Sequence, residues 1–188
     1  MALDVALKEW QSVCRLLAQG RQSVLLRKGG IQEGPGGFAI KHDAFALLPT
    51  RLHQDASMLR PEFRDALEPG DDEPARFDVT HGCRVSDIHI VPSRDTLDRL
   101  SPFHPWNASY LDLRWNYRPE RPLYLVVVRT FALSEALVVK NTYEVAGCRS
   151  WVPLASDVGP TQLAEPVADD ATHDATRNAV AEIVRGRA

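Results

Sequence analysis

The sequence contains only three cysteines, Cys14, Cys83 and Cys148, which are widely spaced and form no CxxC pair. This number and spacing predict neither a disulfide framework nor a zinc knuckle. Long hydrophobic runs are also missing, because the longest, Pro122 to Val128, is far below the roughly 20 residues of a membrane-spanning helix. The N-terminus lacks the basic start and unbroken apolar stretch of a secretion signal. We therefore expect a cytoplasmic protein with reduced thiols and no membrane partner.

Several common catalytic motifs are absent. The sequence has no GxGxxG, GxxxxGK[ST], GxSxG or HExxH pattern, so four frequent site types lack support. No histidines are paired as HxxxH on a predicted helix. His81, Cys83, Asp87 and His89 lie within nine residues, but a half-buried strand explains them better than a metal site does. No metal site is predicted.

The composition is that of an ordinary globular protein. The 188 residues are 44% hydrophobic and 25% charged, which predicts one domain with a sizeable core. The net charge of −3 is uneven, because acidic residues are in excess in 61–80 and 155–188. The remaining residues carry 17 basic and 12 acidic side chains. A mildly basic body of this kind suits an anionic ligand, and solubility explains it equally well.

Hydrophobic spacing and turn residues predict short helices and strands. Apolar residues at three- and four-residue steps predict an amphipathic helix over residues 3–18. Ser93 and Asn107 resemble helix N-caps, the second helix ending near Arg118. Residues 123–133 form the most apolar stretch and are the predicted central strand, buried on both faces. Further strands are expected at 23–26, 38–40, 45–48 (ended by Pro49), 84–91 and around 138–145.

These elements predict a single-domain α+β fold with a mixed or mainly antiparallel sheet, an N-terminal amphipathic helix and short helices near 93–118. Residues 1–154 are the predicted domain. Residues 155–188 lack apolar periodicity and are predicted to be an acidic, flexible tail. The spacing of Val180, Ile183 and Val184 is compatible with one short terminal helix.

A first group of candidate ligand-binding residues follows the strand at 23–26. Arg27 and Lys28 precede Gly29 and Gly30, so side-chain cations and backbone N–H groups could meet a phosphate there. A hairpin turn with solvated charges is the alternative, and the more common one. Other polar candidates are Glu9, His42, His53 and Gln54.

A second group is aromatic and basic. Trp106, Tyr110 and Arg114 stand at four-residue steps on the helix expected after Asn107, and this face either stacks on bases or packs on the sheet. Core packing is the favoured alternative. Arg129 interrupts an apolar strand and needs a carboxylate partner, for which Glu9 or Glu144 is suited.

Several short segments of the sequence resemble a known family. The segments LKEW, LLRKGGI, F-x-I-x-H-x-x-F-x-L-x-P-T-x-x-H-Q and GCRSWVPL resemble the bacterial and archaeal domain of unknown function 1802 (DUF1802) family over residues 3–154. The resemblance implies no established activity. Similar proteins are sometimes fused to a restriction-endonuclease-like domain, which implies a link to restriction or DNA processing.

Three hypotheses about function remain open. In the first, the chain is a nucleic-acid-binding or processing module in which Arg27 and Lys28 contact phosphates and Trp106 or Tyr110 stacks a base. In the second, it is a small enzyme for an anionic metabolite or nucleotide. Its acid or base would be Glu9, His42 or His53, with Lys28 as an electrostatic clamp. The nucleic-acid module is the favoured hypothesis. For either ligand the candidate phosphate- or ligand-binding residues are Arg27, Lys28, Gly29, Gly30, Gln54 and Arg114.

In the third hypothesis, the acidic tail and its apolar C-terminal segment dock on a protein partner. Whether the chain is an enzyme stays open. The only cofactor expected is magnesium, and only for a nuclease-type activity.

Overall fold

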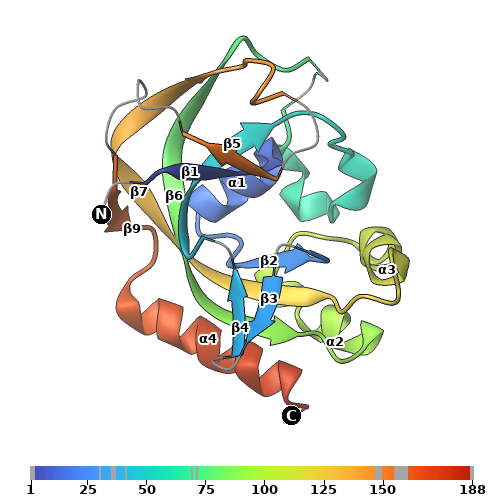
Figure 1. Ribbon diagram of the computed structural model, residues 1–188. Helices are drawn as coiled ribbons and strands as arrows, with labels where there is room; N and C mark the ends of the chain where they lie inside the picture. Colours follow the sequence, from blue (N-terminus) through green and yellow to red (C-terminus); the bar gives the residue numbers. More distant parts are fainter. Residues whose placement is uncertain are drawn as a thin grey trace.

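A mixed sheet of seven strands forms the centre of the computed structural model (Figure 1). The structure describes residues 3–29, 31–34, 37–40, 42–68, 70, 72–146, 150–154 and 161–186. The strand order is β2-β7-β6-β5-β1-β8, and β9 pairs with β7. The bounds of these strands are β1 Val5–Trp10, β2 Val24–Arg27, β5 Ala44–Thr50, β6 Arg76–Ile90, β7 Tyr124–Lys140, β8 Trp151–Pro153 and β9 Leu163–Pro166.

Strands β1 and β5 run parallel, whereas the other pairs in this sheet are antiparallel. A separate hairpin joins β3 (Ile31–Gly34) to β4 (Gly37–Ile40). The helices are α1 Gln11–Ala18, α2 Arg94–Arg99, α3 Ala108–Asn116 and α4 Asp170–Val184, with short 3₁₀ helices at Ala56–Met58, Pro61–Ala66 and Ser101–Phe103. The predicted α+β class with a mixed sheet is confirmed.

The long strands β6 and β7 curve through the whole molecule and carry most of the sheet (Figure 1). In β7 the successive residues Leu125 to Val128 are all buried, as predicted for a strand covered on both faces. Gly82 lets β6 approach its neighbours, because a Cβ there would lie 2.7 Å from the Phe45 carbonyl oxygen and 2.8 Å from Leu163 Cδ2. A larger residue at this crossing would push the strands apart.

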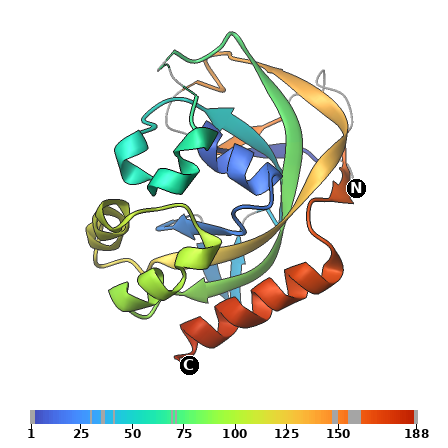
Figure 2. The same ribbon diagram turned by 180° about the vertical axis from the view of Figure 1, so that it is seen from behind.

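Helices α1, α2 and α3 gather on the face of the sheet seen in Figure 2. Their buried side chains, among them Leu17, Leu97 and Leu111, join the larger of two hydrophobic clusters. The second cluster contains Ala6, Leu48 and residues from the first half of β6 and the second half of β7. Alternation along β1 therefore sends Leu7 to one core and Ala6 to the other.

The prediction of a helix over residues 3–18 is wrong in its first half. Residues 5–10 form β1 between β5 and β8, and the helix begins only at Gln11. Val5, Ala6 and Leu7 are each at most 3% exposed, which fits a strand covered on both faces and not a one-sided helix. The predicted end at Gly20 is confirmed by its left-handed φ of 69°.

The predicted helix N-caps are confirmed, and two strand ends differ. Ser93 accepts a hydrogen bond from the Thr96 N–H, and Asn107 accepts one from the Tyr110 N–H. Strand β5 continues through Pro49, since its pairing with β6 ends at Ala46 and proline there removes no ladder hydrogen bond on that side. The strand expected around residues 138–145 ends at Lys140, and Tyr143 lies 96% exposed in a turn.

The terminal helix predicted within residues 155–188 is present as α4, which is fifteen residues long. Strand β9 precedes it and pairs with β7. Val180 is fully buried, and Ile183 and Val184 pack against the larger core. The packed elements thus extend beyond Leu154, the predicted end of the domain, and the apolar residues offered to a protein partner face the protein's own core.

Candidate functional site

A pocket of about 250 Å³ lies where the ends of β1 and β2 meet α3 and the turn after β5. Its lining comes from segments far apart in the chain: Lys8, Glu9, Trp10, Leu26, Arg27, Thr50, Leu52, His53, Tyr110, Arg114 and Ser150. Because β1 and β5 are parallel neighbours, their carboxyl ends reach the same edge of the sheet. The pocket is built at that edge.

Among the described residues, the charged side chains that line the pocket are three cations, Lys8, Arg27 and Arg114, and one carboxylate, Glu9. Arg27 Nη1 donates to Glu9 Oε1 at 2.5 Å, and these side chains are only 11% and 20% exposed. The pair therefore neutralises itself within a largely dry environment. Lys8 Nζ donates to the Val145 carbonyl at 2.6 Å. The lining keeps an excess of positive charge.

Arg114 is the pocket cation that comes from α3. Among the described residues no carboxylate lies within 4.0 Å of it, and its Nε is buried without a hydrogen-bond partner. Its Cζ lies 6.0 Å from the centre of the Tyr117 ring. A buried guanidinium N–H without an acceptor is costly, so an acceptor supplied by a ligand would be favourable here.

Aromatic rings form one wall of the pocket. The Tyr110 ring stacks on Trp106 at 3.8 Å between centroids, and Trp10 meets both rings edge-on. Burial raises the pKa of Tyr110 to about 12, with Arg114 and Arg27 opposing this shift and Glu9 adding to it. The hydroxyl therefore keeps its proton at neutral pH and is available as a donor.

His53 lies exposed at the pocket in the turn that follows β5. Its φ of 62° is left-handed, a conformation that side-chain-bearing residues rarely adopt. Glu73 holds this turn by accepting the N–H groups of Arg51 and Leu52 at 3.0 and 3.1 Å, together with the Thr50 hydroxyl. The backbone that carries the imidazole is thus fixed before any ligand arrives.

The structure brings together four of the predicted site residues, namely Glu9, Arg27, His53 and Arg114. The other described candidates lie outside its lining. Lys28 Nζ donates to the carbonyls of Trp115, Arg118 and Arg121 at 3.0, 3.4 and 3.0 Å, so it holds backbone and does not line the pocket.

Three further predicted residues also lie outside the lining. Gln54 Oε1 accepts from the Ser12 N–H at 2.9 Å and so caps α1. The His42 ring lies 5.1 Å from the Trp151 ring. Gly29 is exposed in a bend, and Gly30 is outside the described residues.

Two expectations about side-chain partners are now answered. Trp106 is only 5% exposed, so its ring packs in the core, as the favoured alternative predicted. The expected pairing of Arg129 with Glu9 or Glu144 is wrong, because Arg129 Nη2 donates to Asp170 Oδ1 at 2.5 Å. Glu9 is already paired with Arg27. The partner of Arg129 comes from α4, which was predicted to lie in the tail.

The pocket also contains residues that the sequence did not single out. Trp10 was assigned to an amphipathic helix, and Thr50 and Ser150 carry no distinguishing signal. Lys8 was marked only by the family resemblance. A strand in place of a helix at residues 5–10 would have placed Lys8, Glu9 and Trp10 at a sheet end, where ligand-binding residues are common.

Within the part of the chain that the structure describes, no three His, Cys, Asp or Glu side chains are grouped as a metal ion would require. None of the described helices is both long enough and apolar enough to span a membrane.

A family model with the description "Domain of unknown function (DUF1802)" matches residues 6–179. No curated protein and no solved structure matches the chain. The match includes β9 and most of α4, beyond the stretch on which the sequence resemblance rested.

Proposed function

Since this chain belongs to the DUF1802 family, whose description names no activity, we propose a function from the pocket itself: it binds the phosphate of a nucleotide-type ligand. The observation that carries the proposal is the convergence of Lys8, Arg27 and Arg114 on one pocket, whose described lining includes a single carboxylate. Charge-assisted hydrogen bonds from guanidinium groups are well suited to phosphate oxygens.

The size and walls of the pocket support this class of ligand. A volume of about 250 Å³ lies just below the range typical of sites that enclose a whole small molecule. The pocket therefore suits the anionic end of a ligand whose remainder stays outside. Trp10 and Tyr110 line the same pocket and offer aromatic surface to a ring next to that phosphate.

Acid–base chemistry on such a ligand would use Glu9 and His53. Both line the pocket, and His53 also meets solvent, so it can exchange a proton with water. This arrangement favours the hypothesis of a small enzyme for an anionic metabolite or nucleotide. The link to restriction or DNA metabolism stays a prediction from the resemblance alone.

The first test is calorimetric titration with adenosine, adenosine monophosphate and inorganic phosphate at two salt concentrations. We expect the monophosphate to bind and adenosine to bind far more weakly, since only the phosphate meets the cations. Arg114→Met should weaken monophosphate binding by roughly 10- to 100-fold, the usual size of a lost hydrogen bond to a charged group.

Arg84→Met is the matched control, because Arg84 is exposed on β6 and lies outside the pocket. The affinity of the Arg84→Met variant for adenosine monophosphate should equal that of the unchanged protein. Equal binding of adenosine and its monophosphate, or an unchanged affinity in a folded Arg114→Met variant, would refute the proposal. Turnover of phosphate esters, measured with and without magnesium, should disappear in Glu9→Gln and His53→Asn if the pocket is catalytic.

A further inference from the structure

The segment that follows α3 surrounds an exposed tyrosine with arginines. Tyr117 is 46% exposed. Arg118 Cζ lies 5.1 Å and Arg114 Cζ 6.0 Å from its centre. Arg118 and Arg121 are themselves exposed. We call Tyr117, Arg118 and Arg121 the α3 surface.

Lys28 stabilises the backbone of the α3 surface. Its buried ammonium reaches from the bend after β2 to three carbonyls of residues 115–121. One cation thus satisfies carbonyls at and beyond the C-terminal end of α3, where the helix dipole also favours positive charge. Arg118 is left-handed with a φ of 47°, which marks a tightly determined turn. The surface is preformed, so binding need not order it.

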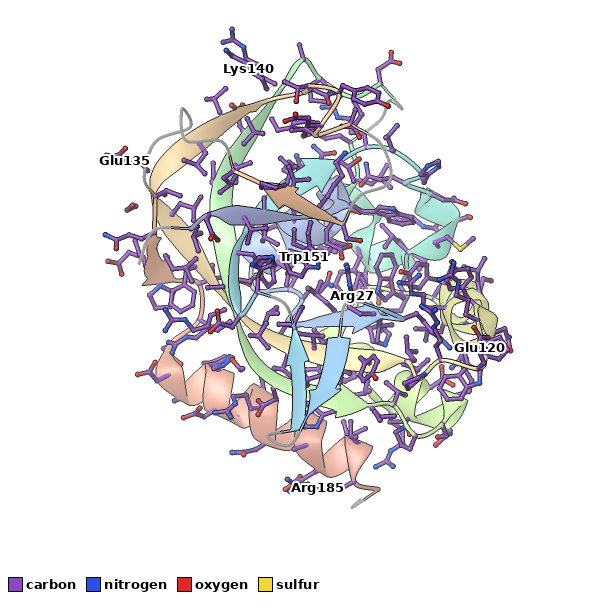
Figure 3. All side chains as sticks on the ribbon, in the orientation of Figure 1. Arg27, Glu120, Glu135, Lys140, Trp151 and Arg185 are labelled. Carbon is purple, nitrogen blue, oxygen red and sulfur yellow. The ribbon has the colours of Figure 1, made fainter. Side chains whose placement is uncertain are left out.

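The arginines of this region have few carboxylate partners among the described residues. Among the described residues, neither Arg114 nor Arg118 has a carboxylate within 4.0 Å. Arg121 has Glu120 at 3.9 Å in a pair that is more than half exposed on both sides, and such pairs contribute little. Glu120 lies at the outer edge of the molecule beside α3 (Figure 3). The α3 surface therefore attracts an extended anion.

Arg114 links the α3 surface to the pocket. Arg114 lines the pocket and also approaches the Tyr117 ring. A ligand with its terminal phosphate in the pocket would leave along Arg114 and meet Tyr117 next. The exposed Tyr117 face can stack on a base, while Arg118 and Arg121 meet the phosphates that follow.

We propose that the ligand is a single-stranded nucleic acid whose terminal phosphate occupies the pocket and whose next nucleotides lie on the α3 surface. This inference rests on the proposed function, and it names the ligand of the same site. A duplex keeps its internal bases paired and stacked, so the nucleotides that follow its end cannot place their bases on Tyr117. An acidic peptide supplies the charge but no planar bases, so the exposed tyrosine favours the nucleic acid.

The test is fluorescence anisotropy with hexanucleotides of single-stranded DNA and RNA, each carrying a 5′-phosphate, a 3′-phosphate or neither. A duplex and a glutamate-rich peptide of equal charge are compared. We expect one phosphorylated single strand to bind at least tenfold more tightly than adenosine monophosphate, the duplex and the peptide. Affinity should fall as salt rises. The DNA and RNA arms show which sugar the site prefers.

Tyr117→Ala combined with Arg118→Met should lower hexanucleotide affinity at least tenfold and leave monophosphate affinity within twofold. Lys140→Met, at the far end of β7 (Figure 3), is the control and should change neither. Monophosphate binding that depends on Arg114, without tighter binding of any hexanucleotide, overturns this inference and leaves the proposed function standing. Hexanucleotides that bind equally well without a terminal phosphate overturn the inference, as does a peptide that binds as tightly.

Discussion

Two residues other than glycine adopt a left-handed backbone within the described chain, His53 with a φ of 62° and Arg118 with a φ of 47°. One lies at the pocket and the other on the α3 surface. Such conformations cost about 1–3 kcal/mol each and persist only where the surrounding structure imposes them. Their positions mark the same region that charge and pocket lining select.

We therefore predict that His53→Gly stabilises the protein and impairs its site. Glycine adopts this φ without strain, and His53 is exposed, so little packing is lost. Relief of about 1–3 kcal/mol of backbone strain should exceed the roughly 0.5–1 kcal/mol that glycine costs by making the unfolded chain more flexible. The free energy of unfolding in urea should therefore rise by about 1 kcal/mol, while any turnover at the pocket falls. His53→Ala separates the two effects, because it removes the imidazole and keeps the strain. Lower stability of the glycine variant would contradict the strain argument.

At the scale of residues, the sequence indicated which residues have the chemistry of a binding site. It did not indicate which partner each side chain contacts. Glu9, Arg27, His53 and Arg114 were candidates because of their chemistry, and they line one pocket. Lys28 was a candidate for the same reason, yet its ammonium holds three carbonyls beyond α3. Nothing local distinguishes a lysine that meets a ligand from one that meets backbone, since the difference lies in residues some 90 positions away.

At the scale of elements, local signals predicted helix starts well and the N-terminal strand badly. The caps at Ser93 and Asn107 act within three residues, so the sequence contains the whole interaction. Strand β1 exists because β5 and β8 pair with it from distant parts of the chain. Apolar residues at helical spacing could not reveal that non-local pairing.

Helix α4 docks on the sheet through polar contacts as well as through its apolar side chains. His173 Nε2 and Ser86 Oγ lie 2.8 Å apart. Arg177 donates to both carboxylate oxygens of Asp87 at 2.6 and 3.0 Å. Arg129 reaches Asp170 from β7. The docking of α4 therefore depends on charge states as well as on the burial of Val180.

We predict that α4 loosens as the pH falls below about 6.5, the ordinary pKa of histidine. Burial lowers the pKa of His173, and Arg129 and Arg177 lower it further. Asp174 and Asp87 oppose this shift. Burial also lowers the pKa of His89, with Asp87 opposing and Arg185 assisting this shift. Because the docked state disfavours both protonated rings, the undocked state gains protons and stability is lost on acidification.

Hydrogen exchange at residues 170–184, compared between pH 7.5 and 5.5 with correction for intrinsic rates, measures this loosening. Protection should fall at the lower pH in the unchanged protein. A His173→Gln, His89→Gln variant has no titrating ring at either position and should show a much smaller difference. The pKa of Asp87 is lowered mainly by its hydrogen bond to Arg177, so that pair persists in this range. Equal pH dependence in both proteins would assign the effect to other groups.

At the scale of the molecule, the pocket is a product of topology. Its residues come from β1, β2, the turn after β5, α3 and the segment before β8, and they meet only because of the strand order. Sequence patterns indicated the α+β class and most elements. They did not contain the parallel pairing of β1 with β5, and without it no argument could bring Glu9 and His53 together.

The last prediction concerns the extent of the folded unit, for which the sequence indicated an end near residue 154. Strand β9 pairs with β7, and α4 places the fully buried Val180 against the larger core. Full burial of one such side chain stabilises a protein by about 1.5–3 kcal/mol. A chain ending at Leu154 should therefore lose at least about 3 kcal/mol in urea unfolding and expose apolar surface to a hydrophobic dye, whereas a chain ending at Gly186 should match the full length. An unchanged midpoint for the shorter chain would support the boundary at 154 and make α4 dispensable to the fold.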